Sequence, residues 1–357
     1  MDTSLFDYEL PQDQIAQAPA QKRDESRLLV VDRQTGQLHH TIFREIGEWL
    51  PEGSRLFRNV AAVLRARILA KLPTGGKVEC LLLHPGETPE QWWCLLKPGR
   101  KLPPGRTFGL EGHFTAEVLE KGGDGQCLVR FQCAGGLSVV DLAEEIGQLP
   151  LPPYIAREGG ENRPEDKKRY QTVYADTTQR VAAAAPTAGL HFTEELISQL
   201  EDKGHEFHDL LLRVGLGTFR PIQAEQLEDH PMHSESYTIG KGALDALRVG
   251  KAGGTRVAIG TTSVRTIEDT LRKDSDTPVS APFTSEANLF LYPPTEFLGV
   301  DALVTNFHLP RSTLLCLVSA FLTPGKTDGI QWLKEIYAEA LDKGYRFYSY
   351  GDAMLIL

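Results

Sequence analysis

The stretch from residue 77 to residue 131 constrains the fold most, because it contains short strand-like segments and no helical period. These segments lie at residues 77–83, 91–96, 107–109, 115–119 and 126–131, and turns rich in Gly and Pro separate them. Short strands with this spacing bury one face by closing into a barrel or by stacking as two sheets. We therefore expect a small barrel or sandwich here.

The rest of the chain alternates strands with helices. Strands are expected at residues 206–214, 256–259 and 302–304, and helices at 193–204, 244–249, 264–271, 330–341 and from Ser312. The first strands, at residues 27–32 and 38–41, are followed only by a helix-like stretch at 43–50 and must join this later part. Since domains average ~100–200 residues, 357 residues make about two. The pattern predicts a discontinuous α/β domain of residues 1–70 and 150–357, interrupted by an inserted β domain of residues 71–149.

The charge balance excludes some functions. The chain has 38 Lys and Arg against 48 Asp and Glu, a net charge of −10, which argues against a globally basic surface that wraps nucleic acid. Its longest apolar stretch, residues 314–322, falls far short of the ~20 residues that span a bilayer, and no basic segment precedes an apolar leader. We expect a cytoplasmic protein with no membrane partner. Five cysteines without a Cys-x-x-Cys pair predict neither a disulfide framework nor a zinc or iron–sulfur site.

Catalytic residue types gather in five loops of the second half, at residues 185–192, 214–219, 230–235, 260–265 and 305–310. In one of them a buried strand runs into Gly260, Thr261 and Thr262 at a helix start, where backbone N–H groups can bind an anion. An ordinary capped helix is the alternative. Arg265, one turn later, could pair with a carboxylate or phosphate or could be a surface arginine.

Histidines are the other candidates. The segment 230–235 places two imidazoles and the carboxylate of Glu235 within six residues, enough for a base, its orienting partner or a metal. Metal binding is the weaker interpretation, because no second ligand pair stands out. His191 and His308 each lie among Gly, Thr, Asn and Pro, which favours a functional loop over a lone structural histidine. A Gly-x-Gly at residues 215–217 suggests close backbone approach or a simple turn.

The β segment contributes a cationic loop with Lys97, Arg100, Lys101 and Arg106 next to Trp92 and Trp93. Cations beside aromatic rings suit RNA, whose phosphates and unpaired bases they contact. A solvated hairpin loop over a Trp-filled core is the alternative.

Read together, these segments resemble the S-adenosylmethionine:tRNA ribosyltransferase-isomerase family of the queuosine pathway, and the chain is identified as a divergent member of it. The matching segments are long and follow one another along the whole chain. They are residues 6–11, 27–30, 151–155, 170–175, 186–193, 214–221, 230–235, 260–263, 305–310 and 345–354.

The resemblance implies an α/β domain interrupted by a β-barrel, which agrees with the reading of the residues. It also implies a reaction in which the ribosyl part of S-adenosylmethionine moves to the aminomethyl group of a 7-deazaguanine base at the tRNA wobble position. Adenine and methionine leave, and epoxyqueuosine is the product. S-adenosylmethionine is a co-substrate, no metal or other cofactor is required, and we expect a monomer whose partner is tRNA.

Within this reaction one group must take a C5′ proton and another must protonate departing adenine. We expect His191, His233, Glu235 and His308 to supply them, since imidazole titrates nearest neutral pH. Gly260, Thr261, Thr262 and Arg265 are expected to hold S-adenosylmethionine, with the helix start or Arg265 meeting its carboxylate. Further substrate-binding residues are expected in the matching segments: Tyr170, Gln171, Tyr174, Thr187, Gly217, Thr218 and Asn306.

The chain also departs from the family pattern. Where the family usually has Asn-Asp-Thr-Arg-Val, this sequence has Asn59-Val60-Ala61-Ala62-Val63; a His before Val-Gly is Arg213, and a Thr-Asp pair is Ala287-Asn288. Two alternatives to an active enzyme follow. One is a catalytically impaired relative that binds RNA and S-adenosylmethionine, and the other is a transferase with a different amine acceptor.

Overall fold

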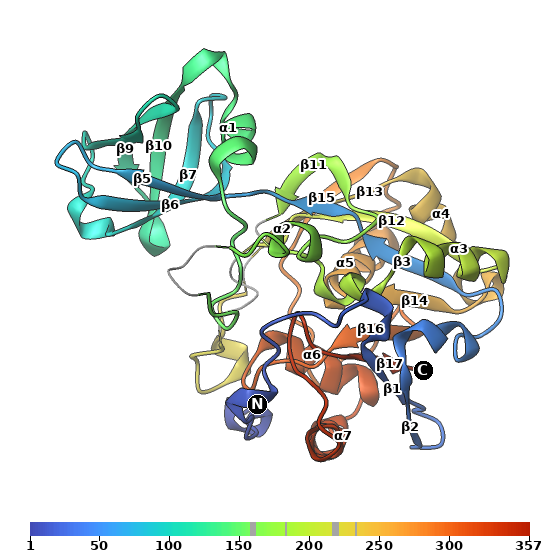
Figure 1. Ribbon diagram of the computed structural model, residues 1–357. Coiled ribbons are helices and arrows are strands. Elements are labelled where there is room, and N and C mark those ends of the chain that lie inside the picture. Colours follow the sequence, from blue (N-terminus) through green and yellow to red (C-terminus); the bar gives the residue numbers. More distant parts are fainter. Residues whose placement is uncertain (158–161, 183, 216–220, 233) are drawn as a thin grey trace. The chain divides into compact units, whose positions relative to one another are not determined.

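The computed structural model describes residues 1–157, 162–182, 184–215, 221–232 and 234–357. The chain divides into two compact units (Figure 1). The α/β unit comprises Met1–Ala61, Gln171–Asp176 and Ala185–Leu357, and the barrel unit comprises Ala62–Tyr170 and Thr177–Ala184. These ranges differ from the expected boundaries after residues 70 and 149, because the first barrel strand begins before residue 71 and residues 150–170 stay with the barrel.

Within the described residues, nine strands form the mixed sheet of the α/β unit in the order β15-β13-β12-β3-β14-β16-β17-β1-β2. The strands β12, β3, β14 and β16 pair in parallel, whereas β13 pairs antiparallel with both β12 and β15, and β17 pairs antiparallel with β16. Their bounds are β1 Arg27–Val31, β2 Leu38–Ile42, β3 Arg55–Asn59, β12 Glu206–Leu212, β13 Glu235–Ile239, β14 Arg256–Ile259, β15 Phe283–Ala287, β16 Ala302–Asn306 and β17 Ala353–Ile356.

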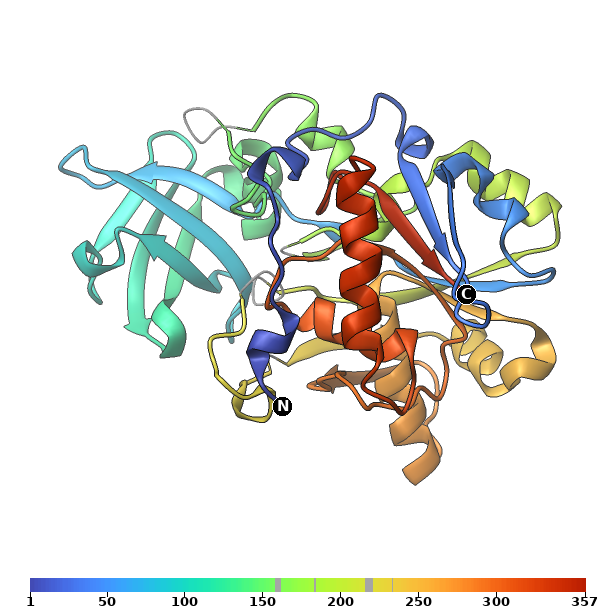
Figure 2. The ribbon, with the colours of Figure 1, turned by 90° about the horizontal axis from the view of Figure 1, so that it is seen from below.

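Helices cover this sheet. They are α3 Glu194–Asp202, α4 Lys241–Arg248, α5 Thr261–Asp276, α6 Thr313–Leu322 and α7 Gly329–Asp342. The helix α5 packs across the central strands, and α7, the long red helix in Figure 2, packs against α6. None of the helices in the described parts of the chain has the length and apolar character needed to cross a bilayer.

Local signals in the sequence explain where these helices begin. Thr193 caps α3 by accepting a hydrogen bond from Leu196 N at 3.0 Å, and Ser312 caps α6 in the same way. The stretch expected to be helical at residues 43–50 instead forms a short 3-10 helix, η4 (Phe43–Glu48). Gly47 lies inside it and approaches the side chain of Leu200 so closely that a Cβ would sit 2.8 Å from Leu200 Cδ2. The close approach requires glycine at position 47, and glycine disfavours a longer α-helix there.

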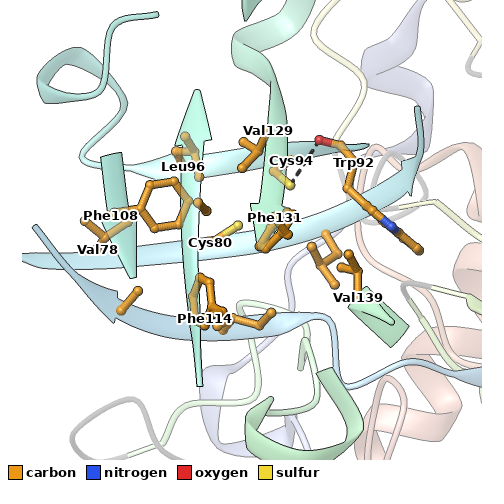
Figure 3. Packing of buried hydrophobic residues seen from close by; sticks show 14 of the residues in the cluster. Val78, Cys80, Trp92, Cys94, Leu96, Phe108, Phe114, Val129, Phe131 and Val139 are labelled. Atoms are coloured by element: carbon orange, nitrogen blue, oxygen red, sulfur yellow. Dashed lines mark hydrogen bonds between the residues drawn. The ribbon is translucent and has the colours of Figure 1, made fainter. Parts of the chain in front are cut away.

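The expected β segment is a closed barrel, which confirms an α/β fold with a small β-barrel. Among the described residues its strands run in the order β10-β7-β6-β5-β8-β9. Their bounds are β5 Arg67–Lys71, β6 Lys77–Pro85, β7 Gln91–Lys97, β8 Thr107–Leu110, β9 Phe114–Lys121 and β10 Gln126–Cys133. Alternate side chains point inward and fill the barrel, with Phe108, Phe114 and Phe131 at its centre (Figure 3).

Four shorter elements of the described residues lie outside the large sheet and the barrel. The helices α1 (Val139–Ile146) and α2 (Asp166–Arg169) follow the barrel, and β4 (Ala61–Val63) pairs with β11 (Asp176–Ala182) as a two-stranded sheet.

Candidate active site

The parallel strands of the α/β unit bring several loops to one edge of the sheet. The strands β12, β3, β14 and β16 all end there, and the antiparallel strands β13 and β17 begin there. We call it the carboxyl edge. Open α/β sheets bind ligands outside the carboxyl ends of their strands, so this edge is the candidate site.

The start of α5 is the first feature of the carboxyl edge. The helix spans 16 residues and follows β14 through Gly260, whose φ of 88° places it in the left-handed region that favours glycine. No side chain of the described residues caps this helix start. Its first backbone N–H groups, at Thr261 and Thr262, therefore precede any intrahelical acceptor and carry the positive end of the helix dipole.

The hydroxyl of Thr262 lies beside these N–H groups. Thr262 is 8% exposed, and its Oγ1 is buried without a hydrogen-bond partner in the part of the chain that the structure describes. A Cβ built on Gly260 would lie 3.6 Å from this oxygen and 3.5 Å from Ala188 Cβ. A buried unpaired hydroxyl at an open helix start costs stability unless a ligand satisfies it. Thr261 and Thr262 thus form a site suited to an anionic group.

His308 follows β16 and is held on three sides. Its N–H donates to Tyr337 Oη at 2.9 Å, its carbonyl accepts a hydrogen bond from the Tyr8 hydroxyl, and its Nε2 lies 2.8 Å from Thr305 Oγ1. Among the described residues Nδ1 has no hydrogen-bond partner. Burial lowers the pKa of His308 to about 3, so the imidazole is neutral near pH 7. His308 is a fixed neutral imidazole with one nitrogen available.

His191 differs, because both of its ring nitrogens are engaged. It ends the 3-10 helix η9 (Thr187–His191), and Nδ1 lies 2.7 Å from Ser26 Oγ. Its Nε2 lies 3.1 Å from Asn306 Nδ2, and the hydroxyl of Thr187 donates to Asn306 Oδ1 at 2.8 Å. Three of the expected residues, Thr187, His191 and Asn306, are therefore in direct contact.

Glu235 and Arg265 are also brought together, but with each other. Arg265 Nη1 donates to Glu235 Oε2 in an ion pair that is almost fully buried. Glu235 Oε1 accepts from Gly215 N at 3.0 Å, and Arg265 Nη2 donates to the carbonyl of Ala287 at 2.9 Å. The ion pair joins β13, β15 and α5, which indicates a structural role. The expected roles of Glu235 in proton transfer and of Arg265 in ligand binding stay predictions.

The remaining expected residues are more scattered. The carbonyl of Gln171 accepts from Arg23 Nη2 at 2.8 Å, and the buried ring of Tyr174 lies under the guanidinium of Arg58, 4.6 Å from its centroid. Burial raises the pKa of the Tyr174 phenol. Tyr170 is buried and belongs to the barrel unit. Three expected residues, His233, Gly217 and Thr218, lie outside the described residues.

The cationic loop lies on the barrel unit. Lys97 ends β7, and Arg100 and Lys101 belong to the short 3-10 helix Gly99–Lys101. These three and Arg106 are exposed, and Lys97 makes a 3.6 Å ion pair with Glu79. Trp92 fills the barrel interior, whereas Trp93 is only half-buried and lies against His84. The loop therefore presents cations at the surface, with one of the two tryptophans accessible beside them.

Sequence reasoning missed the residues that hold the histidines in place. Ser26 and Phe43 contact His191, and Tyr8 and Tyr337 clamp His308. Tyr8 lies in the matching segment 6–11, which was the one available signal. No sequence signal identified Ser26 and Phe43, because a contact between residues about 150 positions apart produces no local pattern in the sequence.

Comparisons with known proteins show which family the chain belongs to. Residues 3–356 match the family described as "Queuosine biosynthesis protein". The chain is 46% identical over its full length to the full-length S-adenosylmethionine:tRNA ribosyltransferase-isomerase of Thermotoga petrophila, and 45% identical to that of Heliobacterium modesticaldum, again over all of both chains. The crystal structure of S-adenosylmethionine tRNA ribosyltransferase from Thermotoga maritima is similar with a TM-score of 0.55 and 37% identity, covering 99% of this chain and 100% of that one.

These similarities extend from one end of the chain to the other and include both units, so the protein belongs to the queuosine biosynthesis protein family.

Proposed function

We propose that this protein is a transferase-isomerase that moves the ribosyl moiety of S-adenosylmethionine onto the 7-aminomethyl-7-deazaguanine base at the wobble position of tRNA. Epoxyqueuosine forms, and adenine and methionine are released. S-adenosylmethionine is a co-substrate, and no further cofactor enters the proposed reaction. The observation that carries the proposal is the carboxyl edge, which bears a helix start with an unpaired hydroxyl after β14 and a neutral histidine after the neighbouring strand β16.

The start of α5 is proposed to bind the carboxylate of S-adenosylmethionine. The N–H groups of Thr261 and Thr262 and the hydroxyl of Thr262 are donors, and the helix dipole favours a negative charge there. The backbone N–H of Gly260 donates to Val304 O at 2.8 Å, which ties this helix start to β16, the strand that carries Asn306 and His308. A ligand held by its carboxylate would therefore extend toward the end of β16.

His308 is the proposed acid–base residue. The positive sulfonium acidifies the neighbouring C5′ hydrogens, so a positioned base can start ring opening, and departing adenine needs a proton. The free Nδ1 of neutral His308 can accept a proton, and its backbone is fixed by Tyr8 and Tyr337. Glu235 would have to leave Arg265 to act as a base, so it is the less suitable of the two.

One assay tests the reaction. The protein is incubated with S-adenosylmethionine and tRNA bearing the aminomethyl-deazaguanine, and free adenine and modified tRNA are measured by chromatography and mass spectrometry. Both products are expected. Adenine without modified tRNA would mean another amine acceptor, and no adenine at all would contradict the proposed reaction.

Two valine variants test the ligand site. Thr262→Val removes the unpaired hydroxyl, and we expect S-adenosylmethionine affinity to fall by ~10-fold or more, as for a hydrogen bond to a charged group. The matched control is Thr266→Val, on the same helix, whose buried hydroxyl already donates to Thr262 O. It should change the affinity less than ~2-fold. Calorimetry that gives both variants the wild-type affinity would remove the start of α5 from the site.

The second candidate function is binding of S-adenosylmethionine and tRNA without turnover. The residues at the carboxyl end of β3 favour it. This strand lies between β12 and β14, so its carboxyl end is at the centre of the edge, where Val60 and Ala61 are buried. The family pattern has an acid and a hydroxyl residue at these positions. Tight binding of S-adenosylmethionine and tRNA with no adenine release would support this candidate over the enzyme.

A further inference from the structure

A chain of buried hydrogen bonds runs through His191 in the α/β unit. It begins at the hydroxyl of Thr187, passes through the side chain of Asn306 and the ring of His191, and ends at Ser26 and the carbonyl of Arg23. The consecutive distances are 2.8, 3.1, 2.7 and 3.2 Å. Whether each of these side chains donates or accepts is set by the neighbour to which it is hydrogen-bonded.

The directions of these bonds determine the tautomer of His191. The Thr187 hydroxyl donates to Asn306 Oδ1, so the amide nitrogen of Asn306 faces His191 Nε2, which must accept. At the other end the Ser26 hydroxyl donates to Arg23 O, so Ser26 Oγ accepts the hydrogen on Nδ1 of His191. Because the carbonyl of Arg23 can only accept, it sets the direction of the whole chain, which places the hydrogen of the neutral imidazole on Nδ1.

The surroundings of His191 keep this form. The side chain is 4% exposed and stacks on Phe43, with 5.0 Å between the ring centroids. Burial, and then the charges of Arg346 and Arg23, lower the pKa of His191 to about 3. A ring that is neutral, stacked and bonded at both nitrogens has no free lone pair and no available proton near pH 7.

Asn306 is the residue that this arrangement controls. It is 3% exposed, and it ends β16 at the carboxyl edge. An isolated carboxamide can turn over and exchange its donor and acceptor ends. Here the lone pair of His191 Nε2 accepts from Asn306 Nδ2, which leaves Oδ1 to accept from the hydroxyl of Thr187. The second N–H of Asn306 Nδ2 and the second lone pair of Oδ1 are left in fixed directions.

We propose that His191 is a positioning residue, which fixes the carboxamide of Asn306 so that its remaining donor and acceptor meet the substrate. This inference rests on the proposed function, because it takes Asn306 to contact the bound substrate. It removes His191 from the acid–base groups and leaves His308 as the expected acid–base histidine among the described residues.

Two isosteric variants separate a positioning role from proton transfer. In His191→Gln the side-chain oxygen can occupy the place of Nε2 and accept from Asn306, but it cannot carry a proton. In His191→Asn the amide reaches only the place of Nδ1 and loses Asn306. We expect His191→Gln to keep kcat within ~5-fold of wild type with an unchanged pH profile, and His191→Asn to lose ~30-fold or more. Equal losses of ~100-fold in both variants would overturn the proposal.

The tautomer gives a readout that does not depend on turnover. In the ligand-free protein labelled with ¹⁵N-histidine, two-dimensional NMR should show His191 with its hydrogen on Nδ1 from pH 8 down to pH 5. A hydrogen on Nε2, or protonation above pH 5, would overturn the proposal. If the wild type releases no adenine, the proposed function fails, whereas the tautomer measured by NMR still decides whether His191 has the form that a positioning role requires.

Discussion

The ion pair of Glu235 and Arg265 gives the sharpest test of how the carboxyl edge is built. Both side chains are about 5% exposed, and besides each other they bind Gly215 N and Ala287 O. Removing one partner leaves the other as an uncompensated buried charge. We therefore consider Glu235→Gln and Arg265→Met, alone and together.

The expected magnitude follows from burial. Breaking a buried pair by removing one charge costs ~3–5 kcal/mol of the free energy of unfolding, whereas removing both charges costs less because no charge remains unpaired. The double variant should thus be more stable than Arg265→Met alone. Each single change should lower stability by ~3 kcal/mol or more, and the coupling between the two positions should be ~2 kcal/mol or more.

Urea unfolding of the four proteins, followed by the fluorescence of Trp49 and Trp332 in the α/β unit, measures these differences. The matched control is Arg248→Met, which breaks the solvent-accessible ion pair between Arg248 of α4 and Asp274 of α5 and should destabilise the protein much less than either buried change. S-adenosylmethionine affinity is measured in parallel. If Arg265→Met unfolds like the wild type but binds S-adenosylmethionine ~10-fold more weakly, Arg265 is a ligand residue and the structural reasoning is wrong.

Three further predictions concern protons and RNA. Because burial lowers the pKa of His308 from 6.5 to about 3, its contribution to stability should fall as the pH drops below 6.5, by ~2 kcal/mol at pH 5; His191 contributes in the same sense, so His308→Gln should reduce the pH dependence in urea unfolding without abolishing it, and an unchanged slope would contradict this. The same variant should release adenine ~100-fold more slowly at wild-type S-adenosylmethionine affinity, and a wild-type rate would exclude His308 as acid or base. Changing the four loop cations Lys97, Arg100, Lys101 and Arg106 to Gln should reduce the dependence of tRNA binding on salt. An unaltered salt dependence would place the RNA-binding surface elsewhere.

The sequence predicted the elements whose signals are local. Alternation of apolar residues located β6, β7 and β10 to within a few residues, and Thr193 and Ser312 marked the starts of α3 and α6. The strand β5 was missed. Only Ile68 and Ala70 of this strand are buried, and the outward-pointing Arg67, Leu69 and Lys71 between them obscure the apolar alternation in the sequence. The antiparallel strands β13, β15 and β17 were missed as well, since an alternating α/β pattern gives no reason to expect them.

The candidate site was only half visible in the sequence. Loops after strands identified Gly260, Thr262, Asn306 and His308 as candidates, because the carboxyl ends of parallel strands meet at one edge. Their partners could not be found in this way. The contact of His191 with Ser26 spans 165 residues, and its contact with Asn306 spans 115. Whether a histidine carries protons or holds a neighbour depends on such contacts.

The end of β3 shows how the carboxyl edge is maintained without polar side chains at its centre. The carboxamide of Asn59 accepts from Ala61 N at 3.1 Å and Leu212 N at 3.0 Å and donates to Leu212 O at 2.9 Å, so it replaces backbone pairing where β3 ends. The buried Val60 and Ala61 that follow cannot exchange protons, and placing a lone carboxylate there would cost several kcal/mol unless a ligand cation paired with it. Among the described residues of this edge, His308 in the loop after β16 is therefore the side chain to which we assign the proposed proton transfer.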